Sequence, residues 1–122
     1  MGLDMNFYSV PKGFDIEASK SQGDFVFHSF RNHSDLHMWL LEQWLKKNPD
    51  KTKDDFNCRF YKITRGTLSK IKKLCLAKKH KHYDNCYWGH SIDQDWEETK
   101  QLCEEIDIRL SNNEDVYYYS WW

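Results

Sequence analysis

The spacing of apolar residues changes repeatedly along this chain, between the period of two typical of strands and the period of 3.6 typical of helices. The period of two marks four short segments, residues 4–10, 24–30, 57–63 and 116–121. The helical period marks three longer segments, residues 34–47, 65–79 and 94–110. At 122 residues the chain has the length of one domain. These patterns predict an α+β fold: a small antiparallel sheet packed against about three helices, in a single domain spanning residues 1–122.

Polar residues at the ends of the helical segments support these bounds. Ser34 and Thr64 stand at the first two helix starts, where a hydroxyl can accept hydrogen bonds from the free N–H groups of the first turn. Ser91 or Asp93 is the expected cap of the third helix. Ser34, Thr64 and one of Ser91 and Asp93 are therefore predicted to be the helix N-caps.

Charge is divided between two successive segments of a nearly neutral chain. The net charge is −1, yet residues 62–82 contain eight Lys and Arg and no acid, and residues 83–122 contain ten acids and two bases. One interpretation is that both are solvated helix faces that attract each other weakly. The other is that one of them docks a charged partner, since a lysine-rich helix can follow a phosphate backbone and an acidic helix can occupy a partner's nucleic-acid groove. The candidate partner-binding residues are Lys70, Lys73, Lys81, Glu97, Glu98, Glu104, Glu105 and Trp121.

Apolar runs and cysteines bear on the compartment. No apolar run approaches the roughly 20 residues that span a bilayer, and no secretory signal pattern stands at the amino terminus. The four cysteines include no Cys-x-x-Cys pair, which favours free thiols over a disulfide framework. We therefore expect a cytoplasmic protein with no membrane association.

Histidines and cysteines, residue types that bind zinc, cluster in one segment: His80, His82, Cys86 and His90. Their spacing matches no Cys-x(2–4)-Cys or His-x(3–5)-His knuckle, and the lysines around them would repel a dication. His33 and His37 lie one helical turn apart, but no third ligand is evident. We therefore expect no metal and no cofactor, and a zinc-dependent domain is the least favoured alternative.

Sequence motifs for catalysis are not found in the chain. Its five glycines form no Gly-x-Ser-x-Gly elbow, no Gly-x-x-x-x-Gly-Lys-Ser/Thr loop and no Gly-x-Gly-x-x-Gly fingerprint. We therefore expect a non-enzymatic protein without catalytic residues.

Several short motifs follow one another in a characteristic order along the chain. It opens with Met-Gly-Leu-Asp-Met before an aromatic strand, continues with Phe30-Arg31 and Leu36-His37-x-Trp39, and closes with Tyr-Tyr-Ser-Trp at residues 118–121. In order and spacing these motifs resemble a family of small uncharacterised proteins of bacteriophages and prophages, although Phe30 stands where Trp is more usual. The resemblance implies a phage or mobile-element context and a location in the host-cell cytosol, but no reaction.

Arg31, His37 and Trp39 of these motifs form a candidate ligand site near Asp4 and the end of the chain. A guanidinium fork, an imidazole and an indole face suit a phosphate or carboxylate next to a ring. The alternative is a buried network of Asp4, Arg31 and His37, with Trp39 in the core.

Two functional hypotheses of different classes follow. The first is a non-enzymatic phage-type accessory protein that binds a host protein or protein–nucleic-acid complex, as an inhibitor of a host defence system of the anti-CRISPR kind. Direct nucleic-acid binding is not favoured. The second is a small-ligand or nucleotide-binding protein that sequesters its ligand with Arg31, His37 and Trp39.

Overall fold

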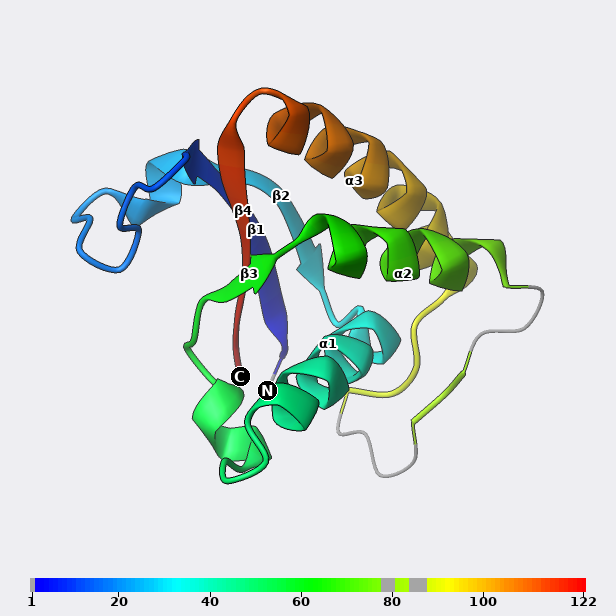
Figure 1. Ribbon diagram of the computed structural model, residues 1–122. Helices are drawn as coiled ribbons and strands as arrows, with labels where there is room; N and C mark the ends of the chain where they lie inside the picture. Colours follow the sequence, from blue (N-terminus) through cyan, green and yellow to red (C-terminus); the bar gives the residue numbers. More distant parts are fainter. Residues whose placement is uncertain (1, 78–80, 84–87) are drawn as a thin grey trace.

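One four-stranded antiparallel sheet and three helices make up the computed structural model, which describes residues 2–77, 81–83 and 88–122 (Figure 1). The strands lie in the order β2-β1-β4-β3. In chain order the elements are β1 (Asp4–Pro11), η1 (Gln22–Phe25), β2 (Val26–Arg31), α1 (Ser34–Lys47), η2 (Lys53–Phe56), β3 (Tyr61–Ile63), α2 (Arg65–Leu76), α3 (Asp93–Ser111) and β4 (Glu114–Trp121), where η marks a short 3-10 helix. The predicted α+β class, with its antiparallel sheet and three helices in a single domain, is confirmed.

The first and last strands form the centre of the sheet. They pair over their whole length, from Asp4 opposite Trp121 to Pro11 opposite Glu114. Because side chains alternate along a strand, Phe7 and Tyr118 point to the face that the helices cover. The aromatic C-terminal segment is therefore a central strand of the sheet, and the side chain of Tyr118 in this strand has no exposed surface.

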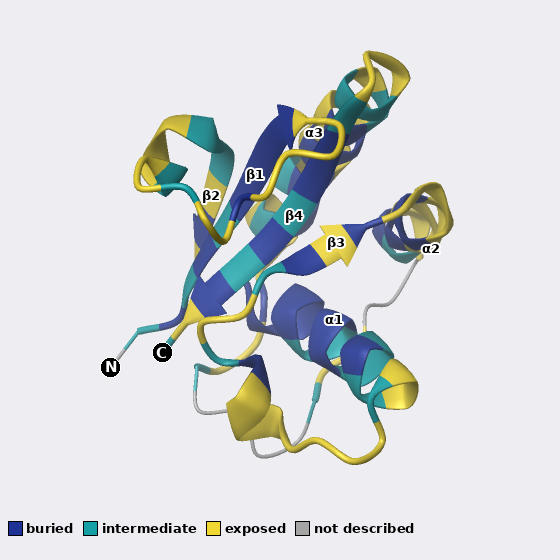
Figure 2. Ribbon diagram, turned by 60° about the vertical axis from the view of Figure 1, so that its left-hand side comes forward, coloured by how far each residue is buried: buried dark blue, intermediate teal, exposed yellow. Residues whose placement is uncertain are grey.

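Both faces of the sheet are covered, by different parts of the chain. Apolar residues of all three helices, Leu36, Leu40, Ile71, Leu102 and Ile106, join the main core on one face. On the other face Tyr8 and Val10 pack with Ile16 of the loop after β1. Figure 2 shows the burial of β1, β4 and the inner side of α1, and the exposure of the outer sides of α2 and α3. Within the described residues, no helix is both long enough and apolar enough to cross a bilayer.

Three elements are shorter than the sequence predicts. A 3-10 turn, η1, occupies residues 22–25, so β2 begins at Val26 instead of residue 24. Cys58 has a left-handed backbone (φ 59°), and its N–H donates to the carbonyl of Ser120, so the chain turns here and β3 begins only at Tyr61. Helix α2 ends at Leu76 because Ala77 is extended. The predicted end of that helix, residues 78–79, lies outside the described residues.

Only one of the predicted helix caps is correct. The Thr64 hydroxyl accepts from the N–H of Thr67 at the start of α2 (3.2 Å). Ser34 is instead the first residue of α1, after the N-cap residue His33, and its hydroxyl donates to the carbonyl of Gly89 (2.7 Å). Helix α3 follows Ile92, so neither Ser91 nor Asp93 is its N-cap. The hydroxyls of Ser34 and Ser91, which local sequence assigns to capping, instead form hydrogen bonds with residues distant in sequence.

Replacing Thr64 by alanine is expected to lower the free energy of unfolding by about 1 kcal/mol, because the first turn of α2 loses its side-chain acceptor. Urea denaturation measures the loss. The control is Ser69→Ala, at an exposed position within the same helix, which should change the free energy of unfolding by less than about 0.5 kcal/mol. Equal effects of the two substitutions would contradict the capping role of Thr64.

Candidate functional site

Helices α2 and α3 lie side by side (Figure 1). The acidic side chain of Asp107 connects their charged sides. The Asp107 carboxylate of α3 accepts a hydrogen bond from Arg65 of α2 (3.0 Å) and lies 3.6 Å from the ammonium of Lys72. The hydrogen bond from Arg65, followed by the charge of Lys72, lowers the pKa of Asp107. The two charged segments therefore attract each other at this point, although exposed pairs of this kind stabilise a fold only weakly.

The candidate partner-binding residues otherwise fall into two groups. Lys70, Lys73 and Glu104 are exposed, and none makes an ion pair with another described residue. The others have neighbours: Glu97 pairs with Lys100 (3.0 Å), Glu105 with Arg109 (3.3 Å), Lys81 with Glu42 (3.9 Å), Glu98 accepts from Gln94 (3.5 Å), and the exposed Trp121 lies beside Tyr119. We use the name charged face for four exposed residues of the two neighbouring helices, Lys70 and Lys73 on α2 and Glu97 and Glu104 on α3.

The candidate ligand residues lie in different surroundings. Arg31 is exposed at the end of the edge strand β2, Trp39 is half-buried on α1, and His37 has no exposed surface. Among the described residues, no hydrogen bond, ion pair or ring contact joins any two of these three side chains. Asp4 is the cross-strand neighbour of Arg31, but the two form no ion pair within 4 Å, so the expected Asp4–Arg31–His37 network is not seen either. A nucleotide site built on these residues gains no support from the geometry.

His37 belongs instead to the aromatic core. Its Nδ1 lies 2.6 Å from the hydroxyl oxygen of Tyr118, and its ring contacts Phe56, Trp88 and Trp122. Burial lowers the pKa of His37 from 6.5 to about 3. The imidazole is therefore neutral at physiological pH and packs as a core side chain.

A different cluster of polar side chains forms at the start of α1. The carboxylate of Asp35 is only 1% exposed, and its Oδ2 lies 2.8 Å from Nδ1 of His82. Its Oδ1 lies 3.7 Å from Nδ1 of His90, a residue that precedes α3. The two imidazole rings lie 4.2 Å apart between centroids, and both are half exposed. We call these three residues the Asp35 centre.

Hydrogen bonds behind the Asp35 centre hold the carboxylate in place. The N–H of Ser91 donates to Oδ2 of Asp35, and the N–H of Asp35 donates to the hydroxyl oxygen of Ser91, both over 2.9 Å. Because the Thr99 hydroxyl donates to the Asp95 carbonyl (2.6 Å), its oxygen accepts from Nε2–H of His33 (2.8 Å). Nδ1 of His33 then accepts from the Ser91 hydroxyl (2.6 Å). His33 is thus a buried support for Ser91.

Sequence reasoning singled out only part of the Asp35 centre. It named His82 and His90 but placed them with His80 and Cys86, which lie outside the described residues. Asp35 was missed because it precedes His82 by 47 residues, and no spacing rule connects positions so far apart. An aspartate in the first turn of a helix ordinarily indicates a favourable charge near the helix N-terminus. Nothing in the local sequence marks this one as the neighbour of two histidines.

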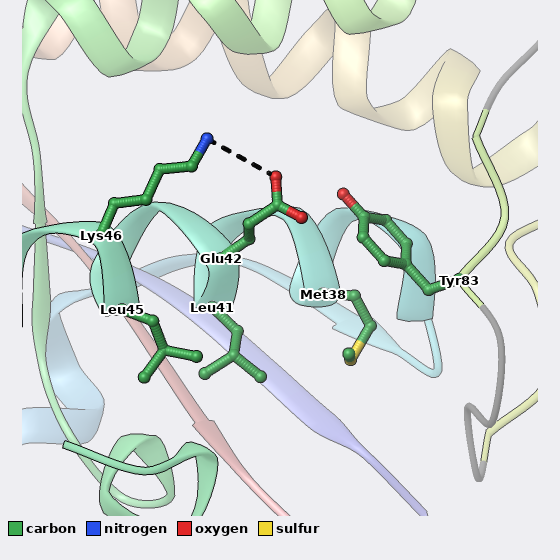
Figure 3. A pocket seen from close by; sticks show the side chains of 6 residues that line it. All are labelled: Met38, Leu41, Glu42, Leu45, Lys46 and Tyr83. Carbon is green, nitrogen blue, oxygen red and sulfur yellow. Dashed lines mark ion pairs between the residues drawn. The ribbon is translucent and has the colours of Figure 1, made fainter. Parts of the chain in front are cut away.

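A hollow of about 400 Å³ lies on the outer side of α1 (Figure 3). Met38, Leu41 and Leu45 supply apolar side chains, and Tyr83 closes one end. The polar groups at the rim, Glu42 and Lys46, pair with each other across 3.8 Å. The hollow therefore offers apolar surface without the convergent polar groups that orient a small ligand.

Comparisons with protein-family models, with curated proteins and with solved structures found no match to this chain. The candidate functional features of the described residues are the charged face on two helices and the buried Asp35 carboxylate beside two histidines.

Proposed function

We propose that this protein is a non-enzymatic, phage-type accessory protein that binds a host macromolecule through the charged face of α2 and α3. The observation that carries the proposal is the exposure of Lys70 and Lys73 without an ion-pair partner among the described residues. The resemblance of the sequence motifs to phage proteins supplies the biological setting. In that setting the function is inhibition of a host defence complex, of the anti-CRISPR kind, in the host-cell cytosol.

The mixture of charges on this surface favours a protein-containing partner. Lys70 and Lys73 attract acidic side chains or phosphates, whereas Glu97 and Glu104 on the neighbouring helix repel a phosphate backbone. Complementary charges at an interface raise the rate of association and select the correct partner. A host protein or protein–nucleic-acid complex that presents both signs of charge therefore fits this face better than bare nucleic acid.

Reversing charges on this face is expected to weaken capture of the partner. The tagged chain is used to isolate complexes from host lysate at low and moderate salt, and the affinity for the isolated partner is then measured for each variant. We expect Lys70→Glu with Lys73→Glu, and separately Glu97→Lys with Glu104→Lys, to reduce affinity by about tenfold or more.

The matched control reverses two exposed lysines in the loop after β1, Lys12→Glu with Lys20→Glu, and should leave affinity unchanged. The proposal fails if no stoichiometric partner is recovered, or if both reversals on the charged face bind as tightly as the control. If both reversals bind as tightly as the control, Lys70, Lys73, Glu97 and Glu104 serve solvation alone.

A further inference from the structure

One oxygen of the buried Asp35 carboxylate lacks a hydrogen-bond partner within the part of the chain that the structure describes. Among the described residues, Oδ1 accepts no hydrogen bond, whereas Oδ2 is hydrogen-bonded to the N–H of Ser91 and to Nδ1 of His82. Burying a carboxylate is unfavourable unless its charge is paired or coordinates a metal. Nδ1 of His90 lies 3.7 Å from Oδ1, too far for a hydrogen bond.

The donor atoms of the Asp35 centre lie close enough together to reach one metal ion. One ligand atom from each residue lies within 4.8 Å of the others. Ligands held about 2.1 Å from a tetrahedral ion are separated from one another by about 3.4 Å. Nδ1 of His90 lies 3.7 Å from Oδ1 of Asp35, close to that value. Nδ1 of His82 lies at a hydrogen-bond distance from Oδ2, 2.8 Å, so binding of an ion requires the His82 ring to move away from the carboxylate by about 0.6 Å.

We propose that Asp35, His82 and His90 bind one divalent transition-metal ion, with zinc and cobalt as representative ions. Two imidazole nitrogens and one carboxylate oxygen are donors that such ions accept, and three protein ligands leave a further position for water. The site goes beyond the proposed partner binding and does not depend on it. Its ion joins the start of α1 to the segments before α3.

The surroundings of the centre suit a metal site. A ligating carboxylate is normally held by a hydrogen bond from a second residue, and here the N–H of Ser91 supplies it. Both histidines are half exposed, which gives an ion a path from solvent. Lys81, whose charge argued against metal in the sequence, lies 3.9 Å from the Glu42 carboxylate and over the ring of Tyr83, which partly neutralises its repulsion.

Metal titration of the full-length chain tests the site. After treatment with a chelator and its removal, the protein is titrated with Zn²⁺ by calorimetry and with Co²⁺ by visible absorption. We expect one ion per chain, and a Co²⁺ spectrum without a thiolate-to-metal charge-transfer band, because the donors are nitrogen and oxygen. His82→Gln and His90→Gln should each weaken binding by tenfold or more.

The matched control is His28→Gln, at a half-buried histidine of β2 outside the centre, which should bind Zn²⁺ like the unchanged chain. Asp35→Asn removes the charged ligand, but it also alters the hydrogen bond that the carboxylate accepts from the N–H of Ser91. If the Asp35 variant does not fold, the His90 variant still tests the site, because His90 is half exposed and its replacement leaves the core unchanged. The site is refuted by the absence of saturable binding, by equal affinity in both histidine variants and the control, or by a thiolate band, which would place the ion on a cysteine.

Discussion

Replacing Phe56 by alanine is expected to lower the free energy of unfolding by about 3–5 kcal/mol. Phe56 is the last residue of η2 and has no exposed surface. Its ring centroid lies 5.2 Å from that of Trp44 on α1 and 6.0 Å from that of Tyr118 on β4. It also contacts the rings of His37 and Tyr61. Truncation leaves a cavity among aromatic rings held by three separate elements, and such rings cannot collapse to fill it.

Urea denaturation followed by tryptophan fluorescence measures this loss. The control is Phe14→Ala, because Phe14 lies in the loop after β1 and is 38% exposed. The control should change the free energy of unfolding by less than about 1 kcal/mol. A loss that small for Phe56→Ala would mean that η2 does not fill the core between α1 and β4.

Acidification from pH 7 to pH 4 is expected to lower the free energy of unfolding by about 3 kcal/mol through His37 alone. Burial lowers the pKa of His37 from 6.5 to about 3 in the folded protein. Between these two values the unfolded chain binds a proton at this residue and the folded chain does not. The stability present above pH 6.5 is therefore lost progressively as the pH falls toward 3.

The pH dependence of unfolding, measured by urea denaturation at intervals from pH 7 to pH 4, isolates this contribution. His37→Gln cannot titrate, so its stability should fall less steeply than that of the unchanged chain, whatever its stability at pH 7. His28→Gln is the control. Burial also lowers the pKa of His28, but Glu98 and Glu105 act in the opposite direction, so its removal should alter the slope less. Identical slopes for the unchanged chain and His37→Gln would contradict a neutral buried imidazole.

Local patterns predict much of the fold because they reflect contacts within one element. The helix over residues 34–47 has the predicted bounds, and the strand at the chain start differs from its predicted bounds by one residue. The predicted bounds of an element are wrong where contacts with distant parts of the chain determine its ends. The Cys58 N–H bonds to Ser120 of β4, and this contact between distant residues shortens β3. The Ser34 hydroxyl bonds to Gly89, and the Ser91 hydroxyl bonds to His33 and to the N–H of Asp35 in the first turn of α1, so neither caps the helix that local sequence assigns to it.

The candidate sites show the same difference between features that local sequence predicts and features that depend on long-range contacts. Sequence placed Lys70 and Lys73 on the outer side of a helix, because helical periodicity alone separates that side from the apolar one. It could not show that His37 is enclosed by aromatic rings, since those rings come from η2, β4 and the segment before α3.

The sequence by itself determined the α+β class, the approximate extent of the helices and the separation of charge between two of them. Each of these depends on residue types repeated at short, regular spacing. The tertiary structure alone decided that Asp35 lies between His82 and His90, with Ser91 holding its carboxylate. The physical reason is that this arrangement requires the start of α1 to meet the segments before α3. The packing of the helices against the sheet brings these segments into contact, and no local sequence pattern encodes that contact.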